Sequence, residues 1–278
     1  MTVTYKDGGI LLTGEENFDP FVSCECGQCF RFEQISADEY CLIANRRKLV
    51  IRRVPQGYFF AATGEEEFNT VWRRYFDLDR DYGEIIGSFA YDEHISRAAE
   101  SGGGIRIFRQ DPWETLVSFI ISQNNNIPRI KKIIAALCEL LGERTGEGVY
   151  CFPAAKAIAE AGVEGLAPIR SGFRAKYIVD AALKTLDGTV DPEAIKNCSY
   201  PEALERLKQI KGVGDKVANC VLLFGYGFYN AFPVDVWVKR VISGYYGDGF
   251  DPASLGEYAG IAQQYLFYYE RNVLGASK

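Results

Sequence analysis

Lys216 stands at a position where a lysine amine could act as a nucleophile. The sequence predicts a helix that ends near Ile210, a sharp turn at Gly212-Val213-Gly214 and a second helix from Asp215. Lys216 then falls in the first turn of the second helix, where the helix dipole disfavours a cation and so favours the neutral amine. A neutral amine can attack an electrophilic carbon and form a Schiff base. Taken alone, Lys216 fits an exposed surface lysine just as well.

Two further residues could complete a site around Lys216. Cys220 is four residues further on and shares the same helix face. Asp235 follows Pro233-Val234, where another helix is expected to begin, so it could simply be a helix cap. A cap would still hold the carboxylate in a fixed, partly buried place. A negative charge there can stabilise a cationic sugar.

The glycine turn could grip a nucleic-acid strand. Two glycines one residue apart let the backbone approach a partner closely, and the amides at a helix N-terminus bind a phosphate. A Gly-x-Gly alone is usually an ordinary turn. Hydrophobic residues at Leu207, Ile210, Val213 and Val217 predict amphipathic helices on both sides. Together they indicate a helix-hairpin-helix, which holds DNA through backbone N–H groups.

The chain that must position these residues changes its periodicity near Gly64. The first sixty residues are rich in β-branched and aromatic segments such as GQCFRFEQI, EYCLIAN, RKLVIRRV and GYFFAAT, which predict an antiparallel meander. Helical spacing follows at Phe68, Trp72 and Tyr75. Further helices are predicted over residues 112–123, 127–141, 173–186, 201–209, 215–224, 234–246 and 255–270.

We therefore expect an α+β fold in two domains. Residues 1–105 should form an antiparallel-sheet domain with helices, and residues 106–278 an all-helical domain, joined at the glycine-rich segment 101–104. The 278 residues are 47% hydrophobic and 24% charged, as in ordinary globular proteins. No membrane span or secretion signal is found, so we expect the cytoplasm.

The charge and the cysteines of the chain limit which partners and cofactors it is expected to bind. The net charge of −6 argues mildly against nucleic acid, although basic clusters at 46–53, 129–132 and 170–176 allow a bipolar surface. Cys24, Cys26 and Cys29 are close enough to suggest a metal knuckle, but no second ligand pair accompanies them and His94 is isolated. No cysteine follows Cys220, which excludes a C-terminal iron–sulfur cluster. We expect reduced thiols and no cofactor.

Six segments, in the same order along the chain, resemble the signatures of one enzyme family. They are GQCFRF at 27–32, RQDPWE at 109–114, SQNNNIPR at 122–129, GFRAKY at 172–177, the hairpin with Lys216 and the later Pro-Val-Asp, and GIAQQYLF at 260–267. The chain resembles the 8-oxoguanine DNA glycosylase/lyases of the helix-hairpin-helix/GPD superfamily, in a bacterial branch. This resemblance implies a TBP-like N-terminal sheet domain.

The resemblance also implies a reaction. A base-excision enzyme of this family flips 8-oxoguanine out of duplex DNA, and Lys216 would attack C1′, displace the base and leave a Schiff base. β-Elimination would then nick the strand, with Asp235 as the acidic partner. The positions that match the family's lesion-base contacts are Gly27, Cys220, Gln263 and Phe267. The Gly27 carbonyl would accept the N7 hydrogen that guanine lacks.

Other positions are implied to contact the rest of the DNA. Those that would wedge the duplex and read the opposite cytosine are Asn124, Arg129, Phe173 and Arg174, which implies a preference for cytosine. Phosphate contacts would come from Gly212, Val213, Gly214 and Trp237. The carbonyls of Lys208, Ile210 and Val213 would hold a structural monovalent cation. The chain departs from the eukaryotic pattern at Cys29, Phe173, Trp237 and Glu270.

Two other interpretations stay open. A glycosylase of the same fold for another lesion, such as an alkylated purine, would share Asp235 and usually lack the lysine. A non-catalytic DNA-binding module would use the hairpin only for grip. The partner implied by the resemblance is double-stranded DNA containing 8-oxoguanine, bound by a monomer at the nucleoid, with no membrane.

Overall fold

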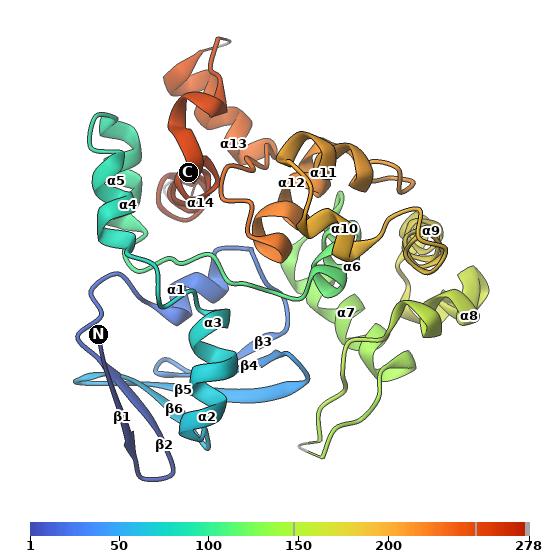
Figure 1. The fold of residues 1–278 in the computed structure, drawn as a ribbon, viewed down its shortest axis with the longest axis horizontal. Coiled ribbons are helices and arrows are strands. Elements are labelled where there is room, and N and C mark those ends of the chain that lie inside the picture. The colour runs from blue at the N-terminus through green and yellow to red at the C-terminus, as the bar shows by residue number, and fades with distance from the viewer. Residues whose placement is uncertain (147, 248, 276–278) are drawn as a thin grey trace.

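Six antiparallel strands form one sheet in the N-terminal region, in the order β1-β2-β6-β5-β4-β3. The computed structural model describes residues 1–146, 148–247 and 249–275 (Figure 1). The strands are β1 Thr2–Lys6, β2 Gly9–Thr13, β3 Phe32–Ser36, β4 Glu39–Ala44, β5 Arg47–Val54 and β6 Gly57–Ala61. The predicted antiparallel meander is confirmed for β3 to β6, whereas β1 and β2 were not singled out as strands.

Alternation of side chains gives the sheet one buried face. In β4, Tyr40, Leu42 and Ala44 are buried and the residues between them only half-buried. A continuous helical segment, made of α2 Glu65–Glu67, a π-helical turn over Phe68–Trp72 and α3 Arg73–Tyr75, covers this face (Figure 1). The rings of Phe60 and Phe68 meet edge to face at 5.3 Å, which anchors this helix on the sheet.

The other regular elements of the described chain are helices. They are α1 Pro20–Glu25, α4 Tyr82–Ser88, α5 Glu93–Ser101, α6 Pro112–Ser122, α7 Ile127–Leu141, α8 Ala155–Gly165, α9 Ala175–Leu186, α10 Pro192–Lys196, α11 Tyr200–Leu207, α12 Asp215–Val221, α13 Val236–Val241 and α14 Ala259–Tyr268. Short π-helical turns extend α12, α13 and α14. The expected α+β fold, a sheet region followed by a helical region, is confirmed. None of the described helices is long and apolar enough to cross a membrane.

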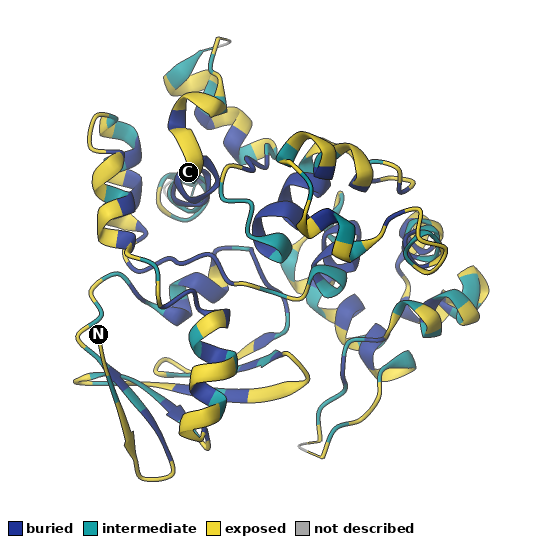
Figure 2. Ribbon diagram, viewed as in Figure 1, coloured by how far each residue is buried: buried dark blue, intermediate teal, exposed yellow. Residues whose placement is uncertain are grey.

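The two regions share packing across the predicted boundary. α4 and α5 precede the glycine-rich segment 101–104, yet Ile85, Ile95 and Ala98 belong to the same hydrophobic core as the helices after it. α14 is buried along most of its length and contributes Ile261, Tyr265 and Leu266 to this core (Figure 2). Tyr265 on α14 donates a hydrogen bond of 3.0 Å to the Ile105 carbonyl. The domain boundary at residue 105 stays a prediction. The last three residues of the predicted helical domain, 276–278, lie outside the described residues.

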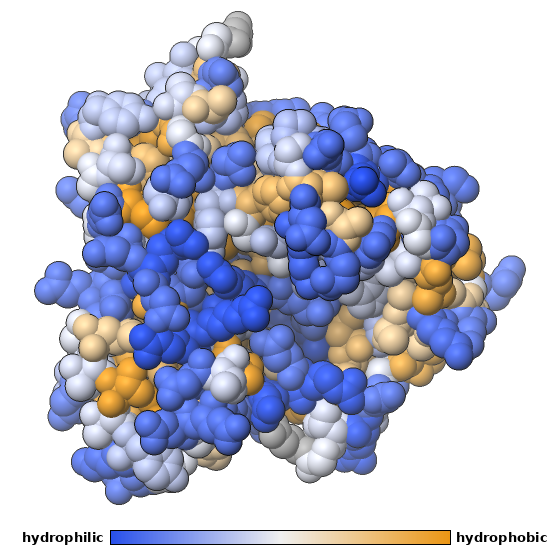
Figure 3. Space-filling view, in the orientation of Figure 1, coloured by the Kyte–Doolittle hydropathy of each residue, from blue (hydrophilic) through white to orange (hydrophobic). Residues whose placement is uncertain are grey.

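The basic cluster at 46–53 is largely engaged in ion pairs on the surface. These pairs are Arg46 with Glu143 at 2.8 Å, Arg52 with Glu39 at 2.5 Å and Arg53 with Asp19 at 2.8 Å. Their partners neutralise these charges, which is typical of an ordinary solvated face. Hydrophilic side chains also gather where the sheet region meets the helices on the face seen in Figure 3.

Candidate active site

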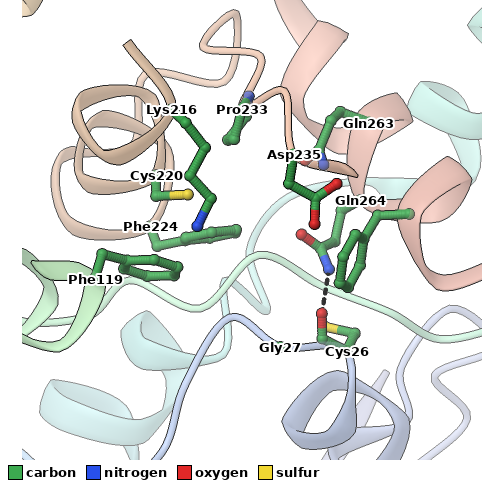
Figure 4. Close-up of a pocket in the computed structure, with 11 residues that line it drawn as sticks. Cys26, Gly27, Phe119, Lys216, Cys220, Phe224, Pro233, Asp235, Gln263 and Gln264 are labelled. Carbon is green, nitrogen blue, oxygen red and sulfur yellow. Dashed lines mark hydrogen bonds between the residues drawn. The ribbon is translucent and has the colours of Figure 1, made fainter. Parts of the chain in front are cut away.

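Lys216 and Asp235 line one small pocket between the two regions (Figure 4). Its volume is about 60 Å³, and it is lined by Cys26, Gly27, Phe119, Lys216, Cys220, Phe224, Pro233, Asp235, Gln263, Gln264 and Phe267. A larger groove, of about 410 Å³, shares several of these lining residues and extends past Asn125, Asn126 and Trp237. The structure therefore brings the two predicted reactive side chains together at one cavity.

Lys216 reaches the pocket from the first turn of α12. Gly214 is the N-cap residue, so Lys216 is the second residue of the helix, as the sequence predicted. Its Nζ atom lies 5.0 Å from the centre of the Phe119 ring. Figure 4 shows the lysine side chain descending beside Cys220 into the pocket. Burial raises the pKa of the Cys220 thiol to about 11, although the Lys216 charge lowers it, so this thiol is protonated at neutral pH.

Asp235 is both a helix cap and a wall of the pocket. Its Oδ1 atom accepts hydrogen bonds of 2.9 Å from the backbone N–H groups of Trp237 and Val238, which begin α13. The carboxylate itself points into the pocket, across from Lys216 (Figure 4). The cap therefore fixes a negative charge beside the amine, which is the arrangement that stabilises a developing cation.

The opposite wall of the pocket carries Gly27 and Gln263. Gly27 has a φ of +80°, and a Cβ atom there would lie 3.3 Å from the Phe267 ring, so the position favours glycine on both counts. Gln263 is 4% exposed, and its Oε1 atom is buried without a hydrogen-bond partner among the described residues. A buried acceptor left unpaired is costly, so a ligand that donates a hydrogen bond there would be favoured.

Two glutamines whose roles the sequence did not reveal hold the Gly27 loop in place. Gln28 is fully buried, and its side-chain amide binds the backbone at Ser23, Arg106 and Phe108 at distances of 2.7–3.0 Å. Gln264 donates a hydrogen bond of 2.6 Å to the Cys26 carbonyl (Figure 4). The motif GQCFRF contained Gln28, but only the folded chain shows which backbone groups it binds.

The residues predicted to contact the opposite strand are exposed, with the exception of Arg174. Arg129 is exposed, and Phe173 is 48% exposed. Arg174 is buried, and its guanidinium donates hydrogen bonds to the carbonyls of Gln123 and Asn124. Asn124 is exposed, with a φ of +47°, so Arg174 stabilises the strained loop that carries it. Burial, and then the nearby charge of Arg129, lower the pKa of Arg174.

The hairpin has the geometry that its glycines predicted. Gly212 has a φ of +78°, and a Cβ atom there would lie 2.4 Å from the Tyr177 ring, so no other residue fits without a shift. Val213 is buried and Gly214 exposed. Of the carbonyls expected around a monovalent cation, that of Ile210 accepts a hydrogen bond of 3.0 Å from the Val213 N–H.

The remaining predicted positions lie close to the groove. Trp237 is half-buried and lines the groove, with the Arg240 guanidinium 4.6 Å from its ring. The Lys208 ammonium pairs with Glu205 and Asp215, each at 2.9 Å. The Cys24, Cys26 and Cys29 thiols are buried and unbridged. The described residues contain no cluster of three or more His, Cys, Asp or Glu side chains suited to a metal ion.

Comparison with known families divides the chain into two consecutive matches. Residues 10–116 match the family described as 8-oxoguanine DNA glycosylase, N-terminal domain. Residues 117–253 match the HhH-GPD superfamily of base excision DNA repair proteins. The chain belongs to the 8-oxoguanine DNA glycosylase family. The resemblance expected from the six sequence segments is thereby confirmed.

Individual relatives match about two thirds of the chain. An N-glycosylase/DNA lyase of Saccharomyces cerevisiae is 35% identical over 66% of this chain, which corresponds to 54% of that protein's length. A probable N-glycosylase/DNA lyase of Methanothermobacter thermautotrophicus is 32% identical over 70% of this chain and 72% of that protein. The relatives' names confirm the prediction of a bifunctional glycosylase and lyase at the level of the family.

A solved structure of this family matches the whole fold. The 8-oxoguanine glycosylase/lyase of Clostridium acetobutylicum, in complex with double-stranded DNA containing cytosine opposite 8-oxoguanine, is 37% identical. The structural match covers 98% of each chain, with a TM-score of 0.91. The predicted arrangement of a sheet region and an HhH-GPD region is therefore that of an 8-oxoguanine glycosylase, and the predicted partner, double-stranded DNA, is the partner in that complex.

Proposed function

We propose that this chain removes 8-oxoguanine from duplex DNA through a Schiff base at Lys216 and then nicks the strand. The observation that carries this proposal is the meeting of an amine and a capped carboxylate at one pocket, although Lys216 and Asp235 come from different helices. The pocket alone is smaller than a purine site, and the groove that shares its lining gives an extruded nucleotide access to it.

The proposed chemistry begins at the sugar of the extruded nucleotide. As the N-glycosidic bond breaks, the base leaves with the bonding electrons, and positive charge develops at C1′ and the ring oxygen. The Asp235 carboxylate stabilises that charge. The Lys216 amine, once it has given up its proton, forms the new bond to C1′, and opening of the sugar ring yields the Schiff base. Loss of a C2′ proton then expels the 3′ phosphate, which breaks the strand.

Recognition of the lesion would come from the other walls of the pocket. The Gly27 carbonyl would accept the N7 hydrogen of 8-oxoguanine, whereas guanine would oppose it with a second acceptor. Two opposed buried acceptors cost roughly 1–3 kcal/mol. The unpaired Oε1 atom of Gln263 would accept a hydrogen bond from the Watson–Crick edge. Phe267 and Cys220 would enclose the two faces of the base.

Borohydride trapping tests the proposal directly. Incubation with a duplex carrying one 8-oxoguanine opposite cytosine should give a covalent protein–DNA adduct when borohydride is present, because the reagent reduces the Schiff base. Base release without an adduct would instead indicate a monofunctional glycosylase, and a matched duplex with an alkylated purine would then identify its lesion. Binding without base release would indicate a non-catalytic DNA-binding module.

The base opposite the lesion should affect the rate of excision. The exposed Arg129 guanidinium can donate to O2 and N3 of cytosine, and one such contact discriminates by about 1–3 kcal/mol, or roughly 5- to 150-fold. We expect excision under single-turnover conditions to be fastest opposite cytosine and Arg129→Leu to narrow the difference. Equal rates opposite cytosine, thymine and adenine would exclude this preference.

The remaining contacts are proposed from the same resemblance. The wedge would include Asn124 and Phe173, with Arg174 supporting the Asn124 loop. The hairpin, with backbone amides at 212–214, would hold a phosphate, and Trp237 would lie along the flanking strand. A monovalent cation at the carbonyls of Lys208, Ile210 and Val213 would be structural. We propose that the enzyme works as a monomer on chromosomal DNA, at the nucleoid of the cytoplasm.

A further inference from the structure

Arg271 brings a second, uncompensated positive charge to the groove beside the pocket. It follows α14 in the π-helical turn Tyr269–Leu274 and is half-buried. Its Nη1 atom is buried and has no hydrogen-bond partner among the described residues. No carboxylate of the described chain lies within 4.0 Å of its guanidinium. The buried guanidinium groups of Arg106 and Arg174, by contrast, donate hydrogen bonds to backbone carbonyls.

The surroundings of Arg271 are those of a substrate channel. It lines the larger groove together with Gly27, Lys216, Asp235 and Phe267. Its guanidinium carbon lies 5.7 Å from the centre of the Phe267 ring, and Nη1 lies 3.6 Å from the position that a Cβ atom of Gly27 would occupy. Arg271 does not line the pocket itself, so its charge lies in the groove at the mouth of the pocket.

Physical chemistry indicates which kind of group this charge would bind. A guanidinium that is partly removed from water and lacks an acceptor is unfavourable until an anion or acceptor arrives. Its planar fork of donors matches the two oxygens of a phosphate. A nucleotide extruded into the pocket draws its flanking phosphates to the mouth, because the sugar and backbone must follow the base.

We propose that Arg271 binds a phosphate that flanks the extruded nucleotide and so holds that nucleotide in the pocket. This inference rests on the proposed function, since it assigns Arg271 to the substrate of that same site. The contact would also keep the guanidinium beside the Phe267 ring. Arg271 is thus a substrate-binding residue, and the reactive atoms remain those of Lys216 and Asp235.

The salt dependence of DNA binding tests the assignment. The probe is a duplex with a tetrahydrofuran abasic analogue opposite cytosine, which the enzyme can bind without breaking a glycosidic bond. For Arg271→Gln we expect the slope of log Kd against log salt to fall by about 0.9, the value for one lost phosphate contact. Arg271→Lys should keep most of the slope. Arg52→Gln, which removes an equal charge from the outer face of β5, should match the wild type.

The second measurement replaces single charged phosphates of the DNA with an uncharged analogue. Duplexes with a single methylphosphonate at each phosphate flanking the analogue should show one position where wild-type affinity falls, on the order of 5- to 10-fold. The same substitution should have no further effect in Arg271→Gln. If that variant does not fold, Arg271→Lys replaces it, and its loss at that position should be smaller than the wild-type loss.

Two results would overturn the proposal. One is weaker binding by Arg271→Gln with an unchanged salt slope, which would mean that Arg271 only supports Phe267. The other is the absence of any sensitive phosphate on either side of the analogue in the wild type. Neither result depends on base release, so a failed borohydride trap would refute the proposed chemistry and leave the Arg271 contact to be judged by binding alone.

Discussion

Lys216→Gln should yield no borohydride-trapped adduct and should lower base release by roughly 10³-fold or more, because the side chain that forms the covalent bond is gone. Glutamine keeps the length and polarity of the lysine and is a good helix former, so α12 should persist. DNA binding should be largely retained, since the hairpin holds its strand through backbone groups. Single-turnover excision, trapping and binding to the abasic-analogue duplex measure the three quantities separately.

A matched control is Lys156→Gln on α8. This lysine is exposed, pairs with Glu160 at 3.8 Å and lines neither the pocket nor the groove. Lys156→Gln removes one positive charge, as Lys216→Gln does, but at a distant site. Its yield of trapped adduct and its rate of excision should therefore equal those of the wild type. If Lys216→Gln still formed an adduct, another amine would be the nucleophile. If Lys216→Gln released the base and nicked DNA at the wild-type rate, Lys216 would have no catalytic role and the hairpin would only hold the DNA.

Asp235→Asn should lower the rate of base release by roughly 10²- to 10³-fold while the fold stays as stable as the wild type. Asparagine caps helices about as well as aspartate, so its side-chain oxygen can still accept from Trp237 and Val238. What it loses is the negative charge that stabilises the cationic sugar, and a preorganised charge or donor of this kind contributes about that factor. Urea unfolding and single-turnover kinetics separate the two effects.

Asp235→Ala is the informative companion. It loses the charge and also the cap, which should lower the free energy of unfolding by about 1 kcal/mol in addition to the loss of activity. Equal activity in Asp235→Asn and the wild type would mean that Asp235 is only a cap. Equal stability in Asp235→Ala and the wild type would mean that the cap hydrogen bonds contribute nothing to folding.

The sequence predicted the elements whose residues repeat with a clear period. Strands β3 to β6 and the helices around Lys216 and Gln263 were found because alternation or helical spacing marks their buried faces. β1 and β2 were missed, since β1 has no buried face that alternation could mark and β2 is fixed by pairing with β6, far away in the chain. The helices α1, α4, α5, α8 and α10 were missed as well, α10 having just five residues.

The site was predicted at the positions that a motif marks and missed where only folding brings groups together. Lys216 and Asp235 could be proposed from local helix starts, because capping and the helix dipole act within one turn. Gln264 on α14 binds the Cys26 carbonyl, and Arg271 in the following π-helical turn lies near Gly27, so both residues meet a segment far away in the sequence. Arg174 was predicted to contact the opposite strand, and its burial against the Asn124 loop required the tertiary structure.

The order of the pocket's walls along the chain affects how the enzyme is made. The Gly27 loop emerges first from the ribosome, the amine and the carboxylate later, and α14 with Gln263 and Phe267 near the end. A nascent chain that has passed Asp235 already carries Lys216 and Asp235, but it lacks the Gln263 and Phe267 side chains of the pocket. A chain that stops before α14 would therefore leave the pocket open on the side that Gln263 and Phe267 line.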